Sequence, residues 1–161
     1  MYLVFKVVHV LAVVVFLGNI TVGIFWKDIA DRTKSPAIIA HTIDGIIRAD
    51  RIFTIPGVIL VIVGGVGAAV AGHIPILATG WLLWGISLFV LSGLAFGPLS
   101  RTQRRMLALA REGEAKGQLD WLGWERLSQR WNLYGMTALI PPFIAAILMI
   151  LKPVLPAFHA Q

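Results

Sequence analysis

His9 is the residue of this chain that is best suited to chemistry. It lies in a long apolar run at the start of the sequence, and Lys6 precedes it by three positions. A neutral imidazole can ligate a metal, and an ionisable side chain inside an apolar span marks a candidate functional site. At about 100° per residue, Lys6 and His9 share one face of a helix. We therefore take His9 as a candidate metal ligand and both residues as candidates for binding a cofactor.

A plainer interpretation of the same two residues is also open. A backbone carbonyl or an interfacial water could satisfy His9, and Lys6 could extend to the lipid headgroups.

The other three histidines bear on whether His9 has a second ligand beside it. His73 follows the second apolar run and His159 lies in the tail, so both are expected on the same side of the membrane as His9. Either could supply a second axial or copper ligand. His41 is expected on the opposite side. The chain has no cysteine, so thiolate sites are excluded and a zinc site is not expected.

Arg48, Asp50 and Arg51 form a second group of charges, directly before an apolar run. Charges at the entrance of a span are costly unless they are paired or reach the headgroups. The two arginines are candidate ligands for an anion or a lipid headgroup. The structural interpretation is that the group anchors a kinked helix and pairs with Asp44, Glu125 or a lipid phosphate.

The sequence contains no catalytic motif that names an enzyme class. It has no G-x-S-x-G, no phosphate-binding P-loop and no H-E-x-x-H. The formal net charge is +6, but the bases lie beside apolar spans, where they set topology and meet anionic headgroups rather than nucleic acid. The first, third and fourth apolar spans contain no carboxylate, which disfavours an ion-coupled transporter.

Four apolar runs must position these residues. Hydrophobic residues make up 58% of the chain and charged residues 14%, a composition typical of membrane proteins. A helix crosses the bilayer core with about 20 apolar residues. We predict an all-α fold, a bundle of four transmembrane helices in a single domain over residues 1–161, with spans at about 2–26, 53–72, 77–99 and 131–151.

The second span should be the last part of a long helix. Ser35 is a suitable N-cap, and Pro36 suits the first helical turn. We expect this helix to run to Gly72 with a kink near Pro56, so that its first part extends into the cytoplasm. A second cytoplasmic extension should follow the third span and stop at Gly117.

Small residues recur along one face of the second span. In lipid there is no hydrophobic drive between helices, and small side chains let two helices approach closely. We expect this stripe to pack against another span, or to bind a second copy of the chain or a partner membrane protein. Its residues are Gly57, Val61, Gly64, Ala68 and Ala71.

The basic residues predict the orientation of the bundle. They gather in the first connection, expected as a loop over 27–36, and in the third connection, over 100–130. The turn near His73 contains neither lysine nor arginine. Because basic connections stay in the cytoplasm, both termini should face away from it.

Three segments resemble a family of small bacterial integral membrane proteins of unknown function. The resemblance covers nearly the whole chain and implies a multi-pass protein of the bacterial inner membrane, without naming an activity. The segments are the opening pattern of Tyr2, Lys6, His9 and Gly18, the stretch RADRIFTIPGV at 48–58, and Trp131 with Tyr134.

A more distant similarity suggests a cofactor. K-x-x-H early in the first span, followed nine positions later by a glycine, resembles the first helix of two membrane families. One is the haem-containing membrane protoporphyrinogen oxidase of bacteria, and the other is the membrane part of the copper-resistance D proteins. In the former family a histidine at this position is taken as a haem ligand, and the corresponding residue here is His9.

The sequence leaves three functions open. The first is a haem b-binding redox or accessory protein with His9 as an axial ligand. The second is a non-enzymatic scaffold or partner subunit that binds another protein or anionic lipid. The third is copper handling through His9 and His73. The sequence does not determine whether the protein is an enzyme.

Overall fold

The computed structural model describes residues 1–158, and all the regular structure within them is helical. Four helical segments are long and apolar enough to cross a membrane: α1, the run from α2 to the end of α3, α4 and α5. The predicted bundle of four spans is therefore confirmed. The elements are α1 (Tyr2–Thr33), α2 (Pro36–Ala49), the π-helical turn η1 (Asp50–Thr54), α3 (Ile55–Ala71), α4 (Gly80–Lys116) and α5 (Trp121–Leu151).

Helix α1 is longer than the first predicted span. It continues to Thr33, so the prediction of a loop over 27–36 was wrong, and the connection to α2 is a short turn. Charged side chains four residues apart stabilise a helix when their signs are opposite. The extra turns of α1 contain two such pairs, Lys27 with Asp31 and Arg32 with Asp28.

Two helix boundaries are the ones that the sequence predicts. The hydroxyl of Ser35 accepts a hydrogen bond from the backbone N–H of Ile38 at 3.5 Å, and Pro36 is the first residue of α2. At the other boundary Gly117 ends α4 with a φ of 69°, a left-handed conformation that glycine adopts without a steric penalty.

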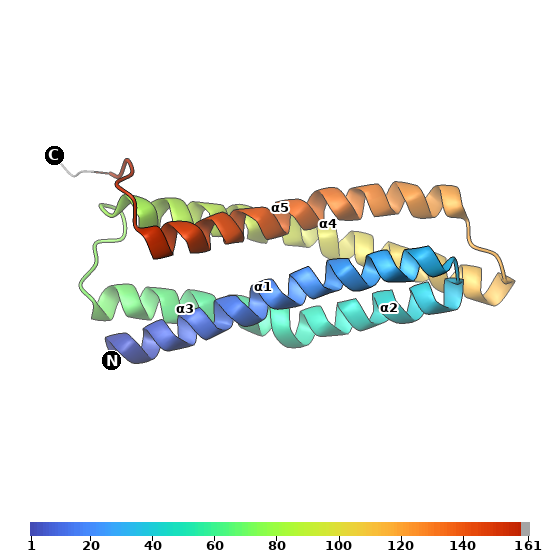
Figure 1. Cartoon of the computed structure of the whole chain (residues 1–161), viewed down its shortest axis with the longest axis horizontal. Helices are drawn as coiled ribbons and strands as arrows, with labels where there is room; N and C mark the ends of the chain where they lie inside the picture. The colour runs from blue at the N-terminus through green and yellow to red at the C-terminus, as the bar shows by residue number, and fades with distance from the viewer. Residues whose placement is uncertain (159–161) are drawn as a thin grey trace.

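The irregularity expected near Pro56 is a π-helical turn directly before it. Pro56 has no N–H to donate to the carbonyl four residues earlier, and its ring crowds that carbonyl. The backbone N–H of Ile55 donates instead to the carbonyl of Asp50, five residues back, which is the π-helical pattern. The turn η1 therefore joins α2 and α3 into one continuous helical segment (Figure 1).

The bundle has two unlike ends, seen in Figure 1. Both termini and the connection from α3 to α4 lie at one end, which we call the terminal end. The turn from α1 to α2 and the connection from α4 to α5 lie at the other. We call it the basic end because it carries the arginine-rich stretch 101–130.

The four segments pack as two pairs that are joined at the basic end. There α2 packs against both α1 and α4, and α1 also contacts α5. Toward the terminal end the pairs are α1 with α3 and α4 with α5. Within the described chain, the backbone of α3 does not come close to that of α4 or α5.

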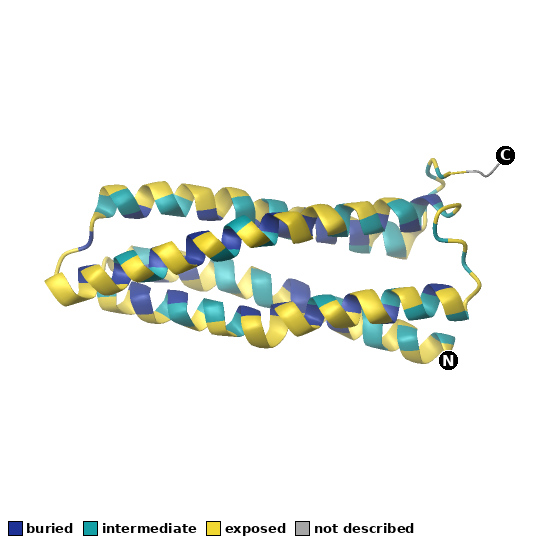
Figure 2. Ribbon diagram, turned by 180° about the vertical axis from the view of Figure 1, so that it is seen from behind, coloured by how far each residue is buried: buried dark blue, intermediate teal, exposed yellow. Residues whose placement is uncertain are grey.

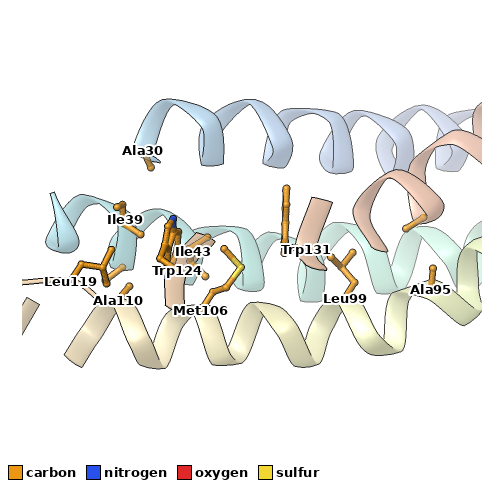
Figure 3. Packing of buried hydrophobic residues seen from close by; sticks show 12 residues of the cluster. Ala30, Ile39, Ile43, Ala95, Leu99, Met106, Ala110, Leu119, Trp124 and Trp131 are labelled. Atoms are coloured by element: carbon orange, nitrogen blue, oxygen red, sulfur yellow. The ribbon is translucent and has the colours of Figure 1, made fainter. Parts of the chain in front are cut away.

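The main hydrophobic cluster follows from this arrangement and lies largely at the basic end (Figure 3). It brings Ile39 and Ile43 of α2 against Met106 of α4 and against Trp124 and Trp131 of α5. Elsewhere, exposed residues follow the outer faces of the helices along their length (Figure 2), and many of them are large and apolar. Such a surface is suited to lipid, whose tails are as apolar as leucine.

Candidate functional site

His9 lies on α1 against the backbone of α3. Its Nδ1 is 2.8 Å from the carbonyl oxygen of Val61. A carbonyl can only accept, so Nδ1 carries the proton and donates this hydrogen bond. The plainer interpretation of His9, a partner carbonyl, thus accounts for one ring nitrogen, and Nε2 forms no hydrogen bond with a described residue.

Glycines of α3 make room for His9. A Cβ added at Gly64 would lie 2.8 Å from the backbone nitrogen of His9, and one added at Gly65 would lie 3.0 Å from its Nδ1. A Cβ at Gly57 would meet Phe16 of α1 at 3.4 Å. The expectation that the small-residue stripe packs against another span is confirmed at Gly57 and Gly64. Association with a second copy or a partner protein remains a prediction.

The other candidate ligands lie apart from His9. Lys6 is exposed, with its Nζ 5.8 Å from the ring centroid of Tyr2. His73 is exposed beyond the end of α3, nine residues after Gly64, which is about 13 Å along a helix axis. The structure therefore does not bring His73 to His9. His41 is exposed on α2.

Residues 1–158 contain no cluster of three or more histidine or carboxylate side chains. His159, the remaining candidate ligand, lies outside the described residues.

The arginines at the start of the second span have different surroundings. Arg48 pairs with Asp44 at 2.7 Å, which is one of the partners expected for it, and Arg111 of α4 approaches the same carboxylate at 3.4 Å. Arg51 is exposed and has no ion pair with any described residue. A headgroup or anion bound by Arg48 and Arg51 remains a prediction.

Asp50 does not share the environment of the two arginines, although it lies between them in the sequence. It is only 8% exposed. One carboxylate oxygen accepts hydrogen bonds from Thr54 at 2.8 Å and from Asn19 of α1 at 3.2 Å. The other accepts from Gln103 of α4 at 2.8 Å. Asn19 also donates to the hydroxyl of Thr54 at 2.9 Å.

This Asp50 network joins three of the four spans through neutral donors alone. Thr54 belongs to the same π-helical turn as Asp50, so the turn contributes both a carboxylate and a hydroxyl to one point in the bundle. Hydrogen bonds to a carboxylate are stronger than those between neutral groups. The network therefore fixes α1 and α4 against the π-helical turn, at the level where the two helix pairs are joined.

A second buried polar group, the Lys27 cluster, lies between α1 and α5. Lys27 is 5% exposed, and its Nζ is 2.6 Å from Asp31. The other oxygen of Asp31 accepts a hydrogen bond from Trp124 at 3.1 Å. The ammonium lies 5.8 Å and 5.3 Å from the ring centroids of Trp124 and Trp131, within the range of cation–π attraction.

Sequence reasoning missed the burial of both charged residues. Asp50 was grouped with its charged neighbours, and Lys27 was assigned to a loop. A signal was present for Asp50, because an aspartate and a threonine four residues apart, directly before a proline in an apolar run, can share one polar site. The i,i+4 spacing of Lys27 and Asp31 indicates a helix, but nothing local marks the burial of Lys27, whose tryptophan partners come from α5.

Comparison with known proteins identifies the family. Residues 3–153 match the model of a family described as "Predicted integral membrane protein (DUF2269)". Since the match spans nearly the whole chain, the protein belongs to this family, and the resemblance to a family of unknown function is confirmed. Neither the curated proteins nor the solved structures compared with the chain include a match.

Proposed function

We propose that this protein is a haem b-binding redox or accessory protein of the bacterial inner membrane, with His9 as an axial ligand. The observation that carries the proposal is the 2.8 Å contact between Nδ1 of His9 and the carbonyl of Val61. Histidines that ligate metals commonly donate their other ring N–H to a carbonyl or carboxylate, which fixes the tautomer and the ring orientation. His9 meets this requirement and has Nε2 available.

The packing of the helices also supports a bound planar group. Phe16, seven residues after His9 and so about two turns along α1, meets Phe89 of α4 with ring centroids 5.8 Å apart. From this contact toward the terminal end, the backbone of α3 does not come close to that of α4 or α5 among the described residues. We take this as the side from which an apolar ring would approach His9.

Several residues of the chain would contribute to binding the haem. The haem would supply one-electron chemistry. His9 would hold it, Val61 would hold His9, and Gly64 with Gly65 would keep the space that the imidazole needs. Lys6, one turn nearer the terminal end, would pair with an anionic edge of the group or with a lipid headgroup.

The geometry favours this proposal over copper handling. The described residues bring no second histidine to His9, and a copper ion bound by His9 and His73 would need both imidazoles within about 2 Å of one metal. Haem needs only one protein ligand, as in the globins and peroxidases. The non-enzymatic scaffold is the alternative function if no cofactor is bound.

The test is an absorbance spectrum of the protein purified in mild detergent from haem-supplemented cells. A Soret band in the oxidised protein that shifts on dithionite reduction is expected, and a single protein ligand predicts one broad visible band in the reduced protein. His9→Ala should lose the bands. His41→Ala is the matched control, since His41 is exposed on α2, and it should keep them.

A featureless spectrum of the wild-type protein at saturating haem would contradict the proposal. Bands that survive in His9→Ala would contradict the assignment of the ligand. A colourless protein would leave the scaffold function.

A further inference from the structure

A depression lies between α4 and α5 in the arginine-rich stretch of the basic end. Its volume is about 470 Å³. Three arginines line it, Arg105 from α4 and Arg126 and Arg130 from α5, beside apolar walls that include Leu109 and Leu127. Two helices thus bring basic groups and apolar surface to one place.

The charges of this depression are not neutralised within the described chain. Arg105, Arg126 and Arg130 are exposed, and none of them forms an ion pair with a described residue. Glu112 is the acidic residue among the lining residues, and its carboxylate is engaged by Lys116 at 2.6 Å. The depression therefore has a net positive charge.

The three arginines follow the apolar spans closely enough for their long side chains to reach the lipid headgroups. Arg130 directly precedes the apolar part of α5, which begins at Trp131, and Arg126 lies about 6 Å further out along the helix. Arg105 is six residues beyond Leu99, where the apolar part of α4 ends, or about 9 Å along the axis. The headgroup layer extends about 5–8 Å beyond the hydrocarbon core.

We propose that this depression binds the phosphate group of an anionic phospholipid such as phosphatidylglycerol or cardiolipin. Arginine presents a planar fork of donors that matches phosphate oxygens. Basic pockets between transmembrane helices are recognised sites for such lipids. The site uses none of the residues proposed to hold haem, so each proposal can be tested independently of the other.

The level of the arginines favours a lipid over a free phosphate ion. Arg130 directly precedes the apolar part of α5, so the depression begins beside the span. A lipid phosphate is already present there, and binding it needs no transfer from solution.

The test is native mass spectrometry of the intact chain released from mixed micelles of phosphatidylglycerol and phosphatidylcholine. We expect retention of phosphatidylglycerol over phosphatidylcholine by the wild-type protein. The triple variant Arg105→Gln/Arg126→Gln/Arg130→Gln should bind it far more weakly, because each basic residue near an anionic lipid contributes about a fivefold change in affinity.

The matched control removes the same charge from other exposed positions. Arg51→Gln/Arg101→Gln/Arg104→Gln takes away three exposed arginines that do not line the depression and should retain most of the lipid. Equal loss in both triple variants would overturn the proposal, since the effect would then be general electrostatics. Displacement of the lipid by inorganic phosphate at low millimolar concentration would also overturn it.

A single substitution tests the site from the opposite direction. Glu112→Gln removes the negative charge from the wall and should strengthen phosphatidylglycerol binding by about fivefold. This variant gains rather than loses binding, so a folding defect cannot imitate the result. Unchanged or weaker binding would contradict the proposal.

Discussion

The carboxylate of Asp50 is held inside the bundle by amide and hydroxyl groups and by no positive charge. Each of its donors, Asn19, Thr54 and Gln103, has given up water to bond it. A buried donor that loses its only acceptor costs about 1–3 kcal/mol. The complete network therefore stabilises the fold, and removing one of its members should lower the free energy of unfolding.

Replacing Asp50 tests that statement. Asp50→Ala removes the acceptor of three hydrogen bonds and should lower the free energy of unfolding by about 2–4 kcal/mol. Asp50→Asn keeps the shape and one acceptor, so its loss should be smaller. Unfolding in mixed micelles with increasing dodecyl sulfate measures both values. An Asp50→Ala variant as stable as the wild type would show that the network contributes nothing.

The Lys27 cluster allows a comparison of two ion pairs on one helix. Lys27→Met leaves Asp31 without its cation beside two tryptophans and should cost about 3 kcal/mol, near the lower end for broken buried pairs. Arg32→Met breaks an exposed pair with Asp28 of the same spacing and should cost under about 1 kcal/mol. Equal effects in the same unfolding assay would mean that the burial of Lys27 has no energetic consequence.

Helices α1 and α3 form one structural unit through their small residues. Gly57 and Gly64 are buried on α3, and their missing side chains are what let the backbone of α1 come close. Close approach increases van der Waals contact, which is the main attraction between helices in lipid. Because His9 belongs to this contact, the pairing of the two helices also positions the candidate ligand.

Enlarging one of these glycines should separate the two helices. Gly64→Leu forces side-chain atoms into the backbone of His9, and overpacking of this kind costs about 1–3 kcal/mol or more. Gly18→Leu is the control on α1, since a Cβ at Gly18 meets nothing within 4 Å. Gly64→Leu should unfold at lower dodecyl sulfate and bind less haem, and Gly18→Leu should behave as the wild type. The reverse order would contradict the α1–α3 contact.

The whole molecule is a bundle that is tightly joined at one end only. Buried apolar residues of α2, α4 and α5 and both polar groups gather toward the basic end. The terminal half consists of two helix pairs with apolar outer surfaces. The backbones of the two pairs are therefore closest at the basic end and further apart toward the terminal end.

The two ends also predict the orientation in the membrane. The connection from α4 to α5 lies in the arginine-rich stretch and should be cytoplasmic, and the termini lie at the opposite end (Figure 1). A phosphatase that is active only outside the cytoplasm should therefore be active when fused after Pro156. Fused within the connection, after Gln118, it should be inactive. The opposite pattern would reverse the topology.

Local signals in the sequence were enough for the architecture. The four spans, the N-cap at Ser35, the stop at Gly117 and the small-residue stripe of the second span all depend on neighbours within a few residues. Hydrophobic length and capping chemistry act over one or two helical turns, so they can be read without knowing which helices meet. The sequence prediction missed the extra turns of α1 because a run of charged residues is typical of a loop. The i,i+4 spacing of their ion pairs indicates a helix instead.

Only the tertiary structure decided which polar groups meet. Asp50 finds Asn19 and Gln103 at separations of 31 and 53 residues, and Asp31 finds Trp124 at 93. His9 was identified from its type and position, but its bond to Val61, 52 residues away, fixes which nitrogen is free. The sequence determines which residues are costly to bury. The folded bundle determines the partners that make their burial favourable, because these partners come from helices distant in the chain.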